Sequence, residues 1–353
     1  MTAVSAHAET HRTGPAGRLR SAETARVLGT LALTLGVIAW AGGDLFRQDL
    51  AVLGATYALL ALGMYMPFNL AGVLSLAYSA YVAIGGYAVG LVATKTGWPL
   101  PVAFLLGAIA SAALAVALGF ATRRLSGFYL AAVTLLFGVA FQSFLLDAKG
   151  ITGGALGIGS IRPLTLFGAE LDRLSLIALA LLTVWIVAVA MDRVRRSPFG
   201  VALQSSRDVP AAVEAAGVGV PALRLTVLGA GAAVASLGGA LFTTANQTIG
   251  PDTFTLHLVT LAIFMPLLGG QGSAWGAVLG AVLVVQLTFN LQIFERAGSL
   301  IFGVAVLAVL VIAPHGILGY TGQAARWLNR RLAGARGTSR RNAEGTGTGG
   351  TAR

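Results

Sequence analysis

Long apolar segments follow one another along almost the whole chain, and only short polar connections separate them. A helix that crosses the hydrocarbon core of a membrane needs about 20 apolar residues, and slightly shorter segments are tolerated. The sequence therefore predicts an all-α, multi-pass integral membrane protein. We expect about ten membrane-spanning helices, near residues 27–43, 50–67, 70–93, 99–121, 126–146, 174–191, 223–245, 256–268, 275–292 and 299–313.

The composition leaves no room for a separate soluble domain. Charged residues make up 10% of the chain and apolar residues 56%, whereas a soluble domain carries about 25% charged residues. We expect a basic tail at residues 1–26, a transmembrane domain at 27–320 and a basic, disordered tail at 321–353. The start of the chain has the outline of a signal peptide, but Ala41-Gly42-Gly43 is a poor cleavage site, so we expect the first helix to be retained.

Arginine clusters set the predicted orientation, because cytoplasmic connections of membrane proteins carry an excess of Lys and Arg. Arg123 and Arg124 follow the fourth predicted span, a run from Asp192 to Arg196 follows the sixth, and several arginines follow the tenth. These connections all lie on one side if both termini are cytoplasmic. The net charge of +11 is explained by the same connections and tails, so we expect no nucleic-acid partner.

Residues 192–222 form the most polar connection between two long apolar segments. Apolar and charged residues alternate there at helical spacing, with Pro210 and Pro221 as boundaries. We predict short helices that lie against the cytoplasmic face of the membrane. Composition alone leaves two interpretations open: a solvated connection whose arginines set the orientation, or a docking surface for a partner protein.

The chain lacks the groups with which a transporter powers itself. Ionisable residues such as Asp147, Asp252 and Glu295 lie only at or near the ends of predicted spans, whereas ion-driven carriers commonly place such groups at membrane depth. Neither lysine, Lys95 or Lys149, follows a glycine, so the sequence has no phosphate loop. Energy for uphill transport would therefore come from another chain. With no cysteine and four scattered histidines, we expect no metal site, no cofactor and no catalytic residues.

Four neutral polar residues, Ser75, Tyr78, Ser79 and Tyr81, follow a predicted helix break at Pro67. Broken helices at membrane depth are tolerated where they line a cavity, and transporters use them at substrate sites. We therefore predict that these four side chains line the path of a solute. Hydrogen bonding from helix to helix is the alternative role for each of them.

The 192–222 connection resembles the cytoplasmic loop of the LivM-type permeases of branched-chain amino acid ABC importers. The matching residues are Ser-Pro-Phe-Gly-Val-Ala-Leu-Gln at 197–204, Arg207-Asp208 and residues 214–218. Residues 127–135, 152–154, 250–254 and 268–276 are similar to other segments of the same family, so that the resemblance covers roughly residues 50–320.

This resemblance implies an all-helical permease, not an enzyme, in the plasma (inner) membrane of a bacterium. The partners that it implies are two cytoplasmic ATPase subunits, a second homologous permease and an extracytoplasmic solute-binding protein. It assigns the contact with the ATPase to the loop, where we expect Pro198, Phe199, Arg207, Asp208 and Glu214 to act in coupling.

Two departures from the family pattern concern the solute. Residues 74–79 read Leu-Ser-Leu-Ala-Tyr-Ser where the family usually has Leu-Ser-Leu-Gly-His-Ala, and Pro314-His315-Gly316 replaces Pro-Arg-Gly. The resemblance implies branched-chain or other hydrophobic amino acids as solutes. A facilitative channel or uniporter for a small neutral solute such as urea is the alternative, and a membrane enzyme would need paired ionisable residues that are not visible in the sequence.

Overall fold

The computed structural model describes residues 15–125, 127–166, 169–270 and 272–291, together with positions 303, 304, 307, 308, 311 and 316. Within these residues the chain is almost entirely helical. The long helices are α1 (Pro15–Ala41), α2 (Leu45–Met64), α3 (Tyr78–Leu91), α4 (Leu100–Ala121), α5 (Gly127–Asp147), α7 (Arg173–Arg196), α10 (Val220–Asn246), α11 (Leu256–Gly269) and α12 (Ala274–Leu291).

Shorter elements connect the long helices. They are α6 (Lys149–Thr152), α8 (Pro198–Asp208), α9 (Pro210–Ala215), π-helical turns at Tyr65–Leu70 and Val92–Thr96, and 3₁₀ turns at Gly154–Leu156 and Pro251–Phe254. A small antiparallel hairpin pairs β1 (Thr165–Leu166) with β2 (Ala169–Glu170). The prediction of short helices between residues 192 and 222 is confirmed by α8 and α9.

Six helical segments of the described chain are long and apolar enough to cross a membrane, judged by length and composition. They are Leu45–Leu70, Leu100–Ala121, Gly127–Asp147, Arg173–Arg196, Val220–Asn246 and Pro251–Gly269, and two shorter apolar helices occupy Val27–Ala41 and Ala274–Thr288. A multi-pass membrane protein is therefore the right class. The predicted span at 299–313 lies largely outside the described residues, so the count of ten stays a prediction.

The predicted continuous helix at 70–93 is wrong, because Ala71–Ala77 is not helical and α3 begins only at Tyr78. A π-helical turn containing Pro67 ends at Leu70, and Gly72 then adopts a left-handed conformation with φ +66°. That conformation favours glycine and stops the helix. The N–H of Val73 donates to the carbonyl of Pro67 at 2.8 Å, which closes the turn.

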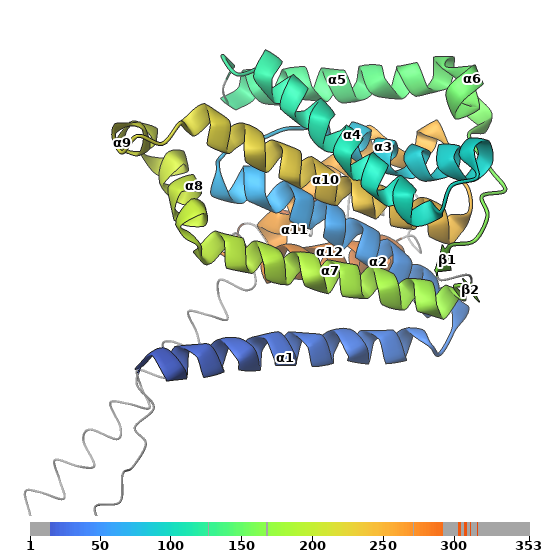
Figure 1. Ribbon diagram of the computed structural model, residues 1–353, viewed down its shortest axis with the longest axis horizontal. Coiled ribbons are helices and arrows are strands. Elements are labelled where there is room, and N and C mark those ends of the chain that lie inside the picture. Colours follow the sequence, from blue (N-terminus) through green and yellow to red (C-terminus); the bar gives the residue numbers. More distant parts are fainter. Residues whose placement is uncertain are drawn as a thin grey trace, which may run out of the picture.

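Helix α10 lies in the middle of the bundle, where it packs against α2, α3 and α4 (Figure 1). Small residues make this packing possible. A Cβ at Gly63 of α2 would lie 2.5 Å from the carbonyl oxygen of Gly231, and a Cβ at Gly85 of α3 would collide with the backbone of Ser236. Close backbone approach of this kind is the usual packing mode of helices in lipid.

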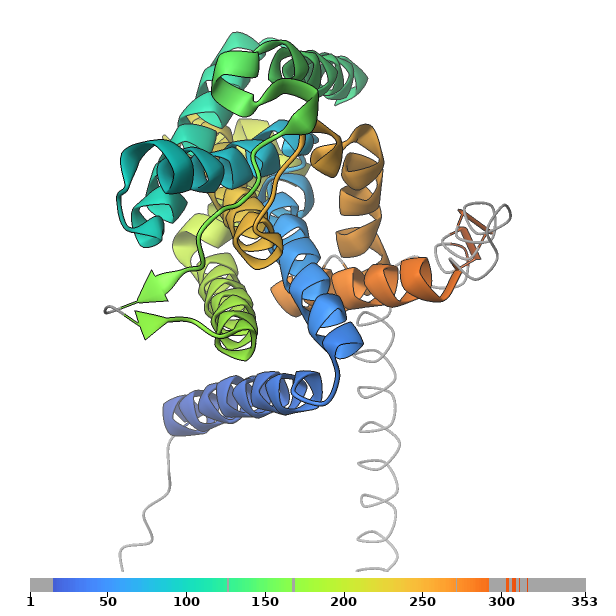
Figure 2. The same ribbon diagram turned by 90° about the vertical axis from the view of Figure 1, so that its right-hand side faces the viewer.

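Helices α1, α2, α4, α5, α7 and α10 run in roughly the same direction across the view of Figure 1, so most of their connections gather at two ends of the molecule. Helix α12 runs across this direction (Figure 2). The end of α4, the end of α7, the start of α10 and the helices α8 and α9 lie together at one end. This end carries the arginines at 123–124 and 193–196. The opposite end holds α6 and the β1–β2 hairpin. There Ile158 and Ile249 form a bridge with N–H to carbonyl distances of 2.8 and 2.9 Å.

Helix α1 lies along the outside of the bundle, next to α7, in both views (Figure 1 and Figure 2). The indole Nε1–H of Trp185 on α7 donates to Thr30 Oγ1 on α1 at 3.2 Å. Several leucines of α1 remain exposed, including Leu33 at 68%. Such an exposed apolar face is expected for a helix that borders lipid or a neighbouring subunit.

Candidate functional site

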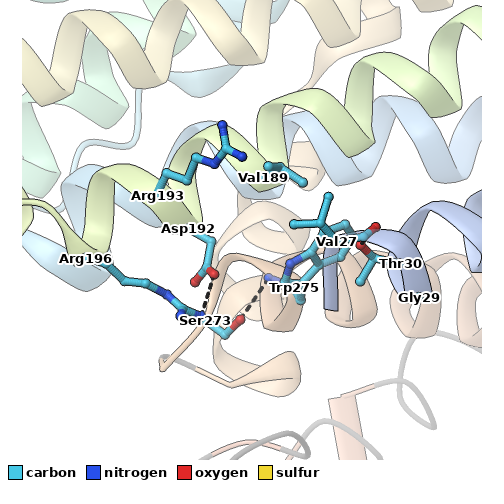
Figure 3. Close-up of a pocket in the computed structure, with 9 residues that line it drawn as sticks. All are labelled: Val27, Gly29, Thr30, Val189, Asp192, Arg193, Arg196, Ser273 and Trp275. Atoms are coloured by element: carbon cyan, nitrogen blue, oxygen red, sulfur yellow. Dashed lines mark hydrogen bonds and ion pairs between the residues drawn. The ribbon is translucent and has the colours of Figure 1, made fainter. Parts of the chain in front are cut away.

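Helix α7 continues through the basic run and ends at Arg196, so the connection to α10 covers residues 197–219 rather than 192–222. Asp192 pairs with Arg195 at 3.4 Å and with Arg196 at 2.7 Å. Basic side chains at the last turn of a helix are favoured by the helix dipole. Figure 3 shows the Asp192–Arg196 pair in the wall of a cavity of about 330 Å³, which Trp275 also lines.

A sharp turn joins α7 to α8. Ser197 caps α8, since its Oγ accepts a hydrogen bond from the N–H of Gly200 at 3.3 Å, and Pro198 occupies the first helical position. A Cβ at Gly200 would collide with the carbonyl of Val194, so a larger residue does not fit there. Pro198 and Phe199 therefore begin a helix whose direction is fixed by its cap.

The outer surface of α8 and α9 is both apolar and acidic. Leu203 and Val213 are buried against the bundle, whereas Val201 and Val209 remain 57% and 54% exposed. Phe199, Asp208 and Glu214 are exposed as well. Exposed apolar side chains that are rimmed by polar ones are typical of protein interaction sites. We call Phe199, Val201, Asp208, Val209 and Glu214 the outer face of the loop.

Arg207 differs from these residues because its side chain reaches back into the membrane domain. Its Nη1–H donates to the backbone carbonyl of Asn69 at 2.7 Å. Its stem packs so tightly on Gly72 that a Cβ there would lie 2.9 Å from the Arg207 Cγ. We had expected this charge to pair with a partner protein, and the internal contact is a role that sequence reasoning missed.

This contact ties α8 to the point where the α2 helix ends and the nonhelical segment Ala71–Ala77 begins. That segment leads directly into α3, which carries Tyr78, Ser79 and Tyr81. The structure thus joins one of the predicted coupling residues, Arg207, to the predicted path residues through one short connection.

The four predicted path residues are all buried, with exposed fractions of 3% for Ser75, 1% for Tyr78, 7% for Ser79 and 1% for Tyr81. The Tyr78 hydroxyl donates to the carbonyl of Gly63 on α2 at 2.9 Å. The Tyr78 and Tyr81 rings meet edge to face at 5.4 Å. In this conformation Tyr78 therefore joins α3 to α2.

Ser79 lies against α5, because a Cβ at Gly138 would come within 2.9 Å of its hydroxyl. The preceding Leu76 donates its N–H to Thr134 Oγ1, also on α5, at 2.9 Å. The nonhelical segment and the start of α3 are thus held between α2 and α5. Any opening along this seam would change the surroundings of both Tyr78 and Ser79.

Several buried hydroxyl groups have no hydrogen-bond partner among the described residues, among them Thr56 on α2 and Ser236 and Thr243 on α10. Buried polar groups are nearly always hydrogen-bonded, so each exception needs a reason. Ser236 faces Gly85, and Thr243 faces Gly86. The sequence did not single out these hydroxyls, because only the structure shows which glycine each of them faces.

The ionisable groups offer neither a metal site nor a catalytic pair at the described interfaces. In the part of the chain that the structure describes, no three His, Cys, Asp or Glu residues lie close enough to hold a metal ion. Most ion pairs found there, such as Arg47–Asp44 and Arg195–Asp192, join residues one helical turn apart, and the pair Arg173–Asp49 joins α7 to α2.

Comparison with known proteins gives consistent matches over most of the chain. The family described as "Branched-chain amino acid transport system / permease component" matches residues 46–313. The high-affinity branched-chain amino acid transport system permease protein LivM of Salmonella typhimurium is 31% identical over 77% of this chain and 70% of its own length. LivM of Escherichia coli has the same identity and coverage. LivH of Escherichia coli is 24% identical over 76% of this chain and 92% of its own length. No solved structure matches.

Proposed function

This chain belongs to the family of branched-chain amino acid transport system permease components, and from that premise we propose that it forms the membrane path for an amino acid as one subunit of a larger importer. The single observation that carries the proposal beyond family membership is the Arg207–Asn69 contact. It connects a cytoplasmic helix pair to a broken helix, which is the arrangement that a permease driven by another chain requires.

The proposed solute is a branched-chain or other hydrophobic amino acid. Relatives at 31% identity are named for branched-chain amino acid transport, which favours this class over a small neutral solute such as urea. We propose that the path runs along the seam between α2, α3 and α10, where Tyr78 and the unpartnered hydroxyls of Ser236 and Thr243 are found, with Ser79 on the side of α3 that meets α5. Neutral polar groups suit a zwitterionic solute, because they bind it without a fixed charge at membrane depth.

The proposed energy source is ATP hydrolysis in two cytoplasmic subunits that dock on the outer face of the loop. Residues 197–219 contain one basic residue, Arg207, and two acidic ones, Asp208 and Glu214. Because Arg207 is engaged internally, the outer face presents the two carboxylates. A docking groove that carries basic residues beside an apolar pocket would be complementary to it.

A second homologous permease and an extracytoplasmic binding protein complete the proposed assembly, in the inner membrane of a bacterium. Helices α4 and α5 are the least enclosed of the candidate spans, and their exposed side chains include Ile109 and Leu136 at 57% and 67%. These helices are available to lipid or to the second permease. The end with α6 and the hairpin would face the binding protein, and both termini would be cytoplasmic.

Co-purification tests the proposal directly. A tagged full-length chain, co-expressed with an ATPase pair of this transporter class, is expected to retain the ATPase subunits after detergent extraction. Replacing both outer-face carboxylates, by Asp208→Lys and Glu214→Lys, should release them, whereas Asp252→Asn at the opposite end should not. Retention that is equal in all three proteins would contradict docking on this face.

A further inference from the structure

A small cationic cavity lies where α8 and α10 meet the broken helix. Its volume is about 250 Å³, and its walls include Asn69, Gly72, Arg207 and Arg224. Arg207 comes from α8, Arg224 comes from the first turns of α10, and Asn69 comes from the π-helical turn. Three elements therefore meet at one cavity. Helix α8 and the start of α10 lie at the same end of the bundle as α9 (Figure 1).

Two residues that line this cavity, Asn69 and Arg224, carry buried polar atoms without hydrogen-bond partners in the described chain. The Asn69 side chain is 5% exposed, and neither its Oδ1 nor its Nδ2 has a hydrogen-bond partner among the described residues. The buried Nε of Arg224 is unpartnered in the same part of the chain. A guanidinium offers five N–H donors, and Arg207, which is an exposed residue, uses one of them on the Asn69 carbonyl. Unsatisfied buried donors are costly unless a ligand or water completes them.

An apolar cavity of about 300 Å³ adjoins the cationic one, since the two share Gly72 and Arg224 in their walls. Aliphatic side chains line most of it, including Val73, Leu130 and Leu228. Arg123 stands in the same wall, with its guanidinium 4.4 Å from the centre of the Phe120 ring. Together the cavities offer an apolar half and a cationic half.

The charge of this double cavity is uncompensated. No carboxylate is present among the described residues that line either half. The cavity at the end of α7 is different, because there Asp192 stands between the arginines and pairs with Arg196 (Figure 3). A planar guanidinium binds a carboxylate through two parallel hydrogen bonds. The cationic half is therefore suited to an anion, and the apolar half beside it is suited to an aliphatic chain on that anion.

We propose that this double cavity is a cytoplasmic binding site for a small aliphatic carboxylate. Arg224 and the free donors of Arg207 would hold the carboxylate, Asn69 Nδ2 would add a further donor, and the chain would lie against Val73 and Leu228. The site itself is independent of the proposed transport function. Two further statements rest on that function: that the transported amino acid, once released, is one natural source of the carboxylate, and that occupancy affects the transport cycle.

Occupancy of the site would affect coupling, because the ligand would bridge the two elements that the Arg207–Asn69 contact already joins. A bound carboxylate would hold α8, α10 and the π-helical turn together in the present arrangement. A ligand stabilises the state to which it binds. Accumulation of the carboxylate in the cytoplasm would thus slow the transport cycle.

Ligand-observed NMR can test the site on the full-length permease in nanodiscs of zwitterionic lipid. The probes are 4-methylpentanoate, leucine, leucinol and inorganic phosphate, and the readout is saturation transfer to the methyl protons, with phosphate added as a competitor. We expect 4-methylpentanoate to bind and leucinol, which has no carboxylate, to give no transfer. Phosphate, which has no aliphatic chain, should compete for the site, with an affinity at least tenfold weaker than that of 4-methylpentanoate. Binding of leucine would identify the amino acid as a source, and its absence would leave a carboxylate without an ammonium group as the ligand.

Two variants and a matched control locate the binding. Arg224→Gln removes one guanidinium and is expected to weaken 4-methylpentanoate binding about tenfold or more. Asn69→Asp is isosteric and supplies a carboxylate from the chain itself, so it should abolish binding while the protein stays folded. Arg193→Gln removes the same charge from the cavity beside Asp192 and should have no effect.

Two results would overturn the proposal. One is the absence of transfer from 4-methylpentanoate in the unmodified permease. The other is equal binding in the Arg224→Gln, Asn69→Asp and Arg193→Gln proteins, which would place the carboxylate elsewhere. Neither measurement needs ATP or a partner subunit, so failure of the site and failure of the transport function are distinguishable.

Discussion

Removing the Arg207 contact should uncouple ATP hydrolysis from transport without preventing assembly. The Arg207→Gln change deletes a charge-assisted hydrogen bond of 2.7 Å to the Asn69 carbonyl and shortens the stem that packs on Gly72. A hydrogen bond to a charged group contributes about 1.5–3 kcal/mol when buried. Arg207 is nevertheless an exposed residue, so solvent screening reduces the expected loss to about 1 kcal/mol. That loss corresponds to about a fivefold change in the equilibrium between joined and separated states.

The assay is the number of solute molecules transported per ATP hydrolysed by the reconstituted complex. We expect this ratio to fall several-fold in Arg207→Gln while the ATPase subunits remain bound. Asp208→Asn, one residue along but on the outer face, is the matched control and should weaken ATPase binding instead. Charge reversal at both positions should abolish solute-stimulated hydrolysis. A normal ratio in Arg207→Gln would refute the argument that this side chain transmits the movement of α8.

Three further predictions concern orientation, packing and the path. A cysteine in place of Ser205 should be labelled by an impermeant thiol reagent only after the cytoplasmic side is opened, and labelling from outside intact cells would reverse the orientation. Gly231→Val should destabilise the protein by about 1–3 kcal/mol, because the added atoms collide with the Gly63 carbonyl. The control Gly54→Ala has free space around the added methyl group and should not destabilise the protein. Thermal unfolding of the two variants in detergent measures the difference, and equal stability would contradict the close packing of α2 and α10. Tyr78→Phe removes the hydroxyl that donates to Gly63 and Ser79→Ala removes one beside α5; both should change the rate or solute preference of uptake, and unchanged uptake of every tested solute would remove these residues from the path.

The membrane class and the positions of most helices could be read from the sequence, because twenty-residue apolar runs have few alternatives to a membrane helix. The break at residues 71–77 could not be placed, since the apolar pattern continues through it. Its cause is local: Gly72 takes a left-handed conformation after the π-helical turn. The end of α7 was misplaced for a similar reason. The sequence places Arg193, Arg195 and Arg196 in a loop, whereas in the structure they form the last turn of α7, where the helix dipole stabilises them.

The sequence identified the segments that form the candidate site but not the contacts between them. The loop at 197–219 and the residues after Pro67 were both recognisable as functional segments, yet nothing in the sequence indicates that Arg207 reaches Asn69 across 138 positions of chain. The cationic cavity was missed for the same reason. Its two arginines, Arg207 and Arg224, lie on separate helices, and each one alone fits the excess of basic residues on the cytoplasmic side.

The central claim, that this chain forms the path of an importer driven by ATP hydrolysis in partner subunits, is tested most directly by uptake of labelled leucine into proteoliposomes. The vesicles would contain the complete complex, with the binding protein and leucine outside and ATP supplied to the ATPase side. The account predicts accumulation of leucine above the external concentration, dependent on ATP and lost when the chain is omitted. Uptake that stops at equal concentrations and does not depend on ATP would contradict it and would identify a facilitator instead.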